Sequence, residues 1–104
     1  MDMIVVMMEQ SGRDALDPND LLIFASVADL GSFSRAAEKM GLPKSTVSRR
    51  LAALEQRLGE RLLLRTTRRQ TLTEFGRELL DHARQVALEV EAVAALSERR
   101  QAAP

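Results

Sequence analysis

Hydrogen-bond donors are spaced along one stretch of the chain so that a helix would present them together. In residues 44–58, KSTVSRRLAALEQRL, positions 45, 48, 49 and 52 fall on one helical stripe and hold two serines, an arginine and an alanine. Small side chains let a helix approach a surface closely, and the hydroxyls and the guanidinium offer donors to it. A helix side that meets only solvent, which is the alternative, more usually carries Glu and Lys. We therefore interpret this stripe as a contact surface.

The basic residues are concentrated in the middle of the chain, although the formal net charge is zero. Residues 35–69 hold ten Lys or Arg against three acidic residues, a net charge of +7, and the flanks together carry −7. A DNA duplex responds to the local field within one Debye length, about 8 Å at physiological salt. The centre of the chain can therefore bind phosphates although the whole is neutral.

Side chains for catalysis or metal binding are absent from the sequence or isolated in it. There is no cysteine, which removes disulfides and thiolate chemistry and fits a reducing cytoplasm. The single histidine, His82, has only Glu78 and Asp81 near it at helical spacing, and Glu55 has no nucleophile or base partner. We expect an ion pair for Glu55, and we expect no enzyme activity, no cofactor and no metal site.

Composition indicates one small, mainly α-helical domain. Hydrophobic residues make up 45% of the 104 residues, and the only aromatic residues are three Phe. A core of Leu, Val, Ala and Met suits helix packing better than packed sheets. The apolar run at residues 3–8 is too short to cross a bilayer and has no basic residue before it. We therefore expect a cytoplasmic protein without a membrane partner.

Two helices with a tight break between them must position the donor stripe. The first is expected over residues 34–40 with Ser34 as its N-cap, and it ends at Gly41, before Pro43. The second is expected over residues 44–58, with apolar residues spaced by four, three and four on the side opposite the stripe. These inner residues are Val47, Leu51, Leu54 and Leu58. The pattern predicts a helix-turn-helix.

Another helix is predicted to precede this pair. Asp17 can serve as its N-cap, Pro18 suits its first position, and Gly31 ends it. We expect Phe33 to pack beneath the first two helices. The buried stripe of this helix is predicted to be Leu21, Phe24, Ala25 and Ala28.

A short hairpin is predicted after the second helix of the pair. Residues 61–65, in which Leu62 and Leu64 alternate with other residues, are expected to pair with residues 70–72. The tip, residues 65–69, lacks the Gly, Asn or Asp that tight hairpins favour, which indicates a longer and looser loop. Its basic side chains fit insertion of Arg68 or Arg69 beside a narrow minor groove; the alternative is a charged loop kept for solubility.

A long helix is predicted from Thr73, which can cap it, because no Gly or Pro occurs in residues 77–103. About 25 helical residues would span roughly 38 Å, more than this small core can cover. Apolar residues at alternating spacings of four and three are typical of a seam between two helices. The predicted seam is Leu79, Ala83, Val86, Val90 and Val93. We expect a homodimer through this helix, with a frayed C-terminal end.

Residues from about 17 to about 96 resemble the N-terminal winged helix-turn-helix domain of the LysR-type bacterial transcriptional regulators. The matching motifs are LLIFASVADLGSFSRAAEKMGLPKSTVSRRLAALEQRLGERLLLRT and the following LTEFG, in the order and spacing of that family. Pro43 departs from the pattern, since many members have Ser or Thr there. Residues 1–16 match nothing in the family; we interpret them as a flexible leader, the alternative being an added strand or packing arm.

The resemblance implies a winged helix-turn-helix over residues 17–72, with a three-helix core and a two-stranded wing, followed by a linker and dimerisation helix over residues 73–104. It implies sequence-specific binding of double-stranded DNA, at a partly palindromic promoter site, by a dimer or by a tetramer of the full-length protein. A small-molecule effector would bind only through a C-terminal domain outside these 104 residues. The alternatives are an architectural DNA binder and a protein-interaction module that uses the long helix.

The resemblance also implies which residues reach DNA, at the helix pair and at the wing. Thr46 and Arg50 are expected at phosphates of the groove walls. The full predicted set is Ser34, Lys44, Ser45, Thr46, Ser48, Arg49, Arg50, Arg65, Thr66, Thr67, Arg68 and Arg69.

Overall fold

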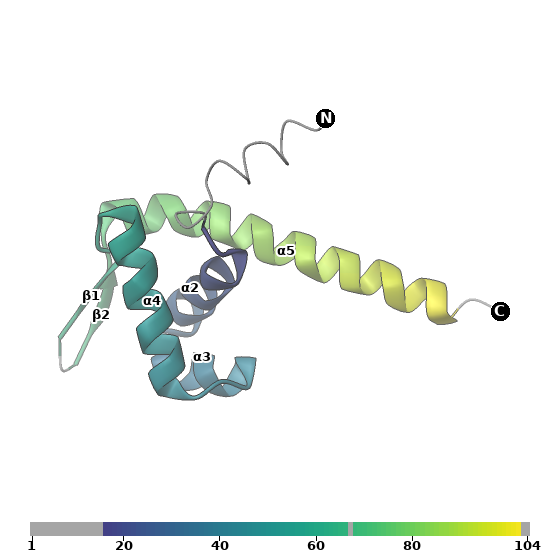
Figure 1. Ribbon diagram of the computed structural model, residues 1–104, viewed down its shortest axis with the longest axis horizontal. Helices are drawn as coiled ribbons and strands as arrows, with labels where there is room; N and C mark the ends of the chain where they lie inside the picture. Colours follow the sequence, from purple (N-terminus) through teal and green to yellow (C-terminus); the bar gives the residue numbers. More distant parts are fainter. Residues whose placement is uncertain (1–15, 67, 103–104) are drawn as a thin grey trace.

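The computed structural model describes residues 16–66 and 68–102 and shows a small helical body from which one long helix projects (Figure 1). The predicted leader, residues 1–16, lies outside the described residues except for Leu16. The elements follow in the order α2 (Pro18–Leu30), α3 (Phe33–Met40), α4 (Lys44–Leu58), β1 (Leu63–Arg65), β2 (Gln70–Leu72) and α5 (Glu74–Ala102). This is the predicted mainly α architecture of three helices, a two-stranded wing and a long helix.

The ends of α2 lie where the sequence predicts them. Asp17 is the N-cap, with its Oδ1 accepting from the amide of Asn19 at 2.9 Å, and Pro18 occupies the first helical position. Gly31 closes the helix in the left-handed conformation, at φ 67°, which an L side chain adopts only with strain.

The N-cap of α3 differs from the prediction. Ser32 caps the helix, its Oγ accepting from the amide of Arg35 at 3.1 Å, so the prediction of Ser34 was wrong. Either serine can supply the hydroxyl, but a start at Ser32 places Phe33 in the first turn, where it is buried in the core. The helix thus begins one residue earlier than predicted, with Phe33 in its first turn.

The core gathers around α2, which contacts α3, α4 and α5. Of the stripe predicted on α2, Phe24 and Ala25 are buried, whereas Leu21 and Ala28 are only half-buried. The prediction omitted two further core residues, Ile23 and Val27. A helix packed against three others buries more than one face, so a single stripe understates its core. On α4 the predicted inner face is confirmed: Val47, Leu51 and Leu54 are buried, and Leu58 is half-buried.

The wing is an antiparallel pair in which Leu63 faces Leu72 and Arg65 faces Gln70. The predicted alternation of Leu62 with Leu64 was wrong, because Leu62 and Leu63 are buried while Leu64 is 52% exposed. Leu62 precedes the strand, so the two-residue period does not apply to it.

Two polar side chains, one from the body and one from the wing, hold the wing in place. Glu55 Oε2 accepts from the amides of Leu62 at 2.7 Å and Leu63 at 3.3 Å, and it forms the expected ion pair with Arg61, at 3.3 Å. From β2, Gln70 Nε2 donates to the carbonyl oxygen of Val27 on α2 at 3.1 Å. The wing is therefore fixed to both α4 and α2.

The helix α5 starts from a close approach to the wing. Thr73 Oγ1 accepts from the amide of Gly76 at 2.9 Å and donates to the carbonyl oxygen of Arg61 at 2.7 Å, which confirms the predicted cap. A Cβ at position 76 would overlap the carbonyl oxygen of Leu62, so only glycine fits there. The helix includes Gly76 and has 29 residues, more than the predicted 25 or so. Among the described residues, no helix is both long and apolar enough to cross a membrane.

Candidate nucleic-acid interface

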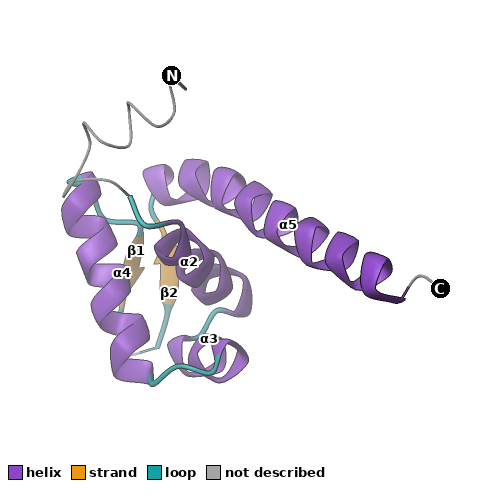
Figure 2. Ribbon diagram, turned by 45° about the vertical axis from the view of Figure 1, so that its right-hand side comes forward, coloured by secondary structure: helices purple, strands orange, loops and turns teal. Residues whose placement is uncertain are grey.

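The helix α4 lies along one edge of the body, beside the two-stranded sheet (Figure 2). Its inner residues are buried, which fixes the direction of its outer face. On that outer face Ser45, Arg49 and Ala52 are exposed, and Ser48 is half-buried. The predicted donor stripe therefore faces away from the core.

The N-terminal end of α4 has no side-chain cap. Pro43 occupies the N-cap position at φ −61° and ψ 144°, and only its carbonyl oxygen participates, accepting from the amide of Thr46 at 3.0 Å. The positive end of the helix dipole is therefore not neutralised by a capping oxygen or by an acidic residue in the first turn. The exposed Lys44 adds a full charge there, whereas Thr46 is half-buried.

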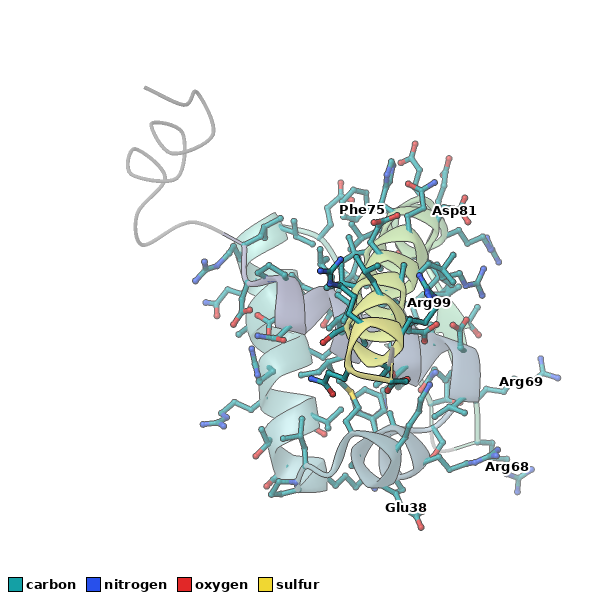
Figure 3. The ribbon with its side chains drawn as sticks, turned by 90° about the vertical axis from the view of Figure 1, so that its right-hand side faces the viewer. Glu38, Arg68, Arg69, Phe75, Asp81 and Arg99 are labelled. Atoms are coloured by element: carbon teal, nitrogen blue, oxygen red, sulfur yellow. The ribbon has the colours of Figure 1, made fainter. Side chains whose placement is uncertain are left out.

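The tip of the wing presents two arginines and is closed by a threonine. Thr66 Oγ1 accepts from the amides of Arg68 at 3.3 Å and Arg69 at 3.0 Å, and the Thr66 amide donates to the carbonyl oxygen of Arg69 at 2.8 Å. A hydroxyl thus takes over the turn-closing role that Asn or Asp fills in other hairpins. The side chains of Arg68 and Arg69 extend away from the body (Figure 3). The predicted contact Thr67 lies outside the described residues.

Arg65, at the base of the wing, stacks on an aromatic ring. Its guanidinium carbon lies 4.0 Å from the centroid of Phe33, a cation–π contact that links β1 to α3. The residue remains exposed, so the stacking orients the guanidinium without removing it from the surface. The sequence pattern contained no signal for this pair.

A shallow hollow of about 210 Å³ brings predicted contacts from three elements together. Ser34 comes from α3, Lys44 from the start of α4, and the arginines at 65, 68 and 69 from the wing. Four cations and three hydroxyl side chains, the predicted contact Thr66 among them, therefore border one small concave surface, a combination that attracts anions.

Arg50 is the predicted contact that the structure places elsewhere. Its Nη2 lies 2.7 Å from Oδ2 of Asp17, and its Nε lies 2.7 Å from Oδ1 of Asp20. Both carboxylates belong to the N-terminal end of α2, and the Arg50 side chain is only 30% exposed. Arg50 therefore spans the body, and it is not a free cation on the outer face of α4.

The predicted seam of α5 divides into a covered and an uncovered part. Ala83 is fully buried in the core of its own chain, which excludes it from a surface for a second chain, and Leu79 and Val86 are half-buried. Val90 and Val93 are 50% and 63% exposed. Two more exposed apolar residues of α5, Leu88 and Leu96, were missing from the predicted seam.

In the described ranges, no three His, Cys, Asp or Glu side chains are grouped so that they could hold a metal ion. His82 is exposed on α5.

Residues 18–77 match the family model described as the bacterial regulatory helix-turn-helix protein, LysR family. A HTH-type transcriptional regulator of Xanthomonas campestris is 55% identical over 75 residues, which cover 72% of this chain and 22% of the relative. The HTH-type transcriptional activator AllS of Klebsiella pneumoniae is 50% identical over 70 residues, 67% of this chain and 26% of the relative. The chain thus spans about a quarter of the length of these relatives.

Solved structures show the same arrangement. A complex of the BenM DNA-binding domain with catB site 1 DNA has a TM-score of 0.72 at 26% identity, covering 86% of this chain and 100% of that one. Oxidised OxyR of Corynebacterium glutamicum has a TM-score of 0.72 at 29% identity, covering 79% and 25%.

Proposed function

Because the chain belongs to the LysR family of bacterial regulatory helix-turn-helix proteins, we propose that it binds double-stranded DNA sequence-specifically as part of a transcriptional regulator. One observation carries this proposal: the outer face of α4 is exposed, rich in donors and flanked by the cations of the wing. Such a regulator would bind the bacterial chromosome, in the cytoplasm. Any effector response would belong to the longer protein.

In this proposal α4 enters the major groove. That groove is about 12 Å wide, admits a helix, and presents a distinct pattern of donors and acceptors for each base pair. Lys44 and Arg49 can donate to O6 and N7 of guanine or to phosphate, and Ser45 and Ser48 can serve either role. The small side chain of Ala52 allows the helix to lie close to the base edges.

The wing then meets the neighbouring backbone and minor groove. A narrow minor groove concentrates negative potential, which favours the exposed guanidiniums of Arg68 and Arg69. The hollow bordered by Ser34, Lys44 and Arg65 lies between the wing and α4, where a backbone phosphate would complement its charge. Phosphate contacts of this kind fix the register of the domain while α4 reads bases.

We also propose that two copies pair through the distal part of α5. Four of its large apolar side chains are at least half exposed in the described chain: Leu88, Val90, Val93 and Leu96. Leu88 and Val90 also border an apolar hollow of about 430 Å³ with Met40 of α3, where side chains of a second chain would fit. Two paired domains would meet half-sites about one helical turn, roughly 34 Å, or a multiple of it apart.

The test is selection of bound duplexes from a random-sequence pool, followed by footprinting of the winner against mixed-sequence competitor. We expect one protected site with two related halves and an affinity that falls steeply with salt. Protection without a preferred sequence would favour an architectural DNA binder. Absence of binding even at low salt would favour a protein-interaction module that uses α5.

A further inference from the structure

Two adjacent arginines of α4 have different surroundings. Arg49 is exposed on the outer face, whereas Arg50 is 30% exposed and holds two carboxylates. A helix turns about 100° per residue, so neighbouring positions point in clearly different directions. The sequence places Arg49 on the donor stripe and Arg50 beside it, but it gives no signal for the two carboxylates that Arg50 holds.

The contact of Arg50 joins the middle of α4 to the start of α2. Its Nε and Nη2 each lie 2.7 Å from a carboxylate oxygen, of Asp20 and Asp17 respectively. Asp17 is itself held in place, because its other oxygen caps α2 by accepting from the amide of Asn19. The Asp20 side chain is 16% exposed. We call the three charged side chains, Arg50, Asp17 and Asp20, the α2–α4 clamp.

The clamp restrains rotation of α4 about its own axis, a motion that the apolar core resists weakly. Val47, Leu51 and Leu54 hold α4 against the body, but apolar contact is not directional and tolerates a small roll of the helix. A planar guanidinium with two fixed acceptors is directional, since both hydrogen bonds require one orientation. A rotation of α4 about its own axis would break the clamp. It would also displace the side chains of Ser48 and Arg49 as one unit.

We propose that Arg50 is a positioning residue, which through the α2–α4 clamp sets the rotation of α4 and so the register of its outer face against the bases. This inference rests on the proposed DNA binding and adds that Arg50 itself contacts no phosphate. The charge of the clamp supports this, because two carboxylates and one guanidinium leave a net charge of −1. The clamp therefore contributes no net attraction to DNA.

The experiment compares Arg50→Gln with Asp20→Ala, which break the clamp from opposite sides. Each variant is titrated with the duplex selected by the unmodified chain and with a scrambled duplex, over a series of salt concentrations. We expect both variants to lower the ratio of the two affinities, by roughly tenfold if one base contact loses its alignment. Arg50→Gln should leave the slope of log affinity against log salt unchanged.

The direction of the two effects distinguishes the clamp from a direct interaction with DNA. If Arg50 bound a phosphate, Arg50→Gln would flatten the slope by about 0.9 for each phosphate that is no longer neutralised. Asp20→Ala would then strengthen binding, because it removes a negative charge. Either result would overturn the inference.

Two controls separate positioning from stability and from charge. Glu38→Ala removes an exposed acidic residue of α3, which points away from the body (Figure 3), and should leave the affinity ratio unchanged. Arg50→Lys can keep one of the two ion pairs, so we expect an intermediate ratio; this variant also replaces Arg50→Gln in the comparison if the latter does not fold. Thermal unfolding followed by circular dichroism is used to choose a titration temperature at which every variant is folded. An unchanged ratio in folded Arg50→Gln or Arg50→Lys would show that the clamp only stabilises the fold.

Failure of the proposed function gives a result that differs from failure of the clamp inference. In that case the unmodified chain would bind every duplex with the same affinity as its scrambled version.

Discussion

Large apolar side chains are buried in the body of the molecule, whereas on the distal part of α5 they are exposed. In the body, the inner faces of α2 and α4 are buried, and the surfaces around them carry hydroxyls and cations. From Leu88 onward, α5 exposes four large apolar side chains, each at least 50% accessible. The polar surface suits a polyanion, and the apolar one suits another protein. One short chain thus presents two surfaces of opposite chemical character.

The boundary between the two regions lies within α5. Leu80 and Ala83 are the last buried residues of the helix, 4% and 0% exposed. In the next position, Arg84 donates from Nε to Oδ1 of Asp29 on α2 at 3.0 Å. The hydrogen bond and the charge of Asp29 raise the pKa of Arg84. Beyond this pair, the large apolar side chains of the helix are exposed from Leu88 onward.

The largest expected effect compares apolar truncations on the two sides of this boundary. Leu80→Ala leaves a cavity in the core and should lower the free energy of unfolding by about 2–5 kcal/mol in urea denaturation. Val93→Ala should change the free energy of unfolding by less than about 0.5 kcal/mol. Both variants are measured in a form of the chain that is monomeric. Equal losses would show that distal α5 packs against its own body.

The second prediction concerns only the distal part of α5, where large apolar side chains are exposed. Val90→Asp should shift the chain toward monomer, because a carboxylate in an apolar seam is costly to bury. Light scattering measures the mass, and Glu78→Gln, at an exposed position nearer the start of α5, is the control expected to remain dimeric. A dimer that persists in Val90→Asp would place the interface elsewhere.

A smaller effect is expected where α5 joins the wing. Gly76→Ala forces a methyl group against the carbonyl oxygen of Leu62, and overpacking of this kind costs about 1–3 kcal/mol. Thermal denaturation should show the loss, whereas Arg77→Ala, at the exposed neighbouring position, should leave the melting temperature nearly unchanged. Full stability of Gly76→Ala would mean that the wing is not held against α5.

The last of these predictions concerns the polar surface, where the effect falls on binding and not on stability. Arg49→Ala should weaken binding to the selected duplex by about 1–3 kcal/mol if its guanidinium reads a base, with little change in stability. A mobility-shift titration measures this, with Arg99→Ala at the far end of α5 as control. Unchanged affinity would remove Arg49 from the site.

Features set by neighbours in the chain could be predicted from the sequence. Asp17 and Pro18 start α2, glycines end each of the first three helices, and Thr73 caps α5, because caps depend on residues within one turn. The outer face of α4 was predictable for the same reason, since its inner leucines fix the period. The family resemblance supplied the assignment of the wing, which the residues alone indicated weakly.

Features set by distant residues could not be predicted in this way. Ser32 and Ser34 both offer a capping hydroxyl to nearby amides, so local spacing does not decide between them, and the helix is capped by Ser32. Arg50 pairs with Asp17, 33 positions earlier, and a pattern read along one helix gives no signal for a contact of that kind. Ala83 matched the seam period but faces the core, because a heptad-like pattern does not say which neighbour covers it.

The most direct test of DNA binding through α4 and the wing is the salt dependence of affinity for variants on the two sides of the molecule. Replacing Lys44, Arg49, Arg68 and Arg69 by Gln should flatten the slope of log affinity against log salt by about 0.9 for every phosphate that is no longer neutralised. Replacing Arg99 and Arg100 at the end of α5 should leave the slope unchanged. Equal slopes in the unmodified chain and in the first variant would contradict binding through this surface.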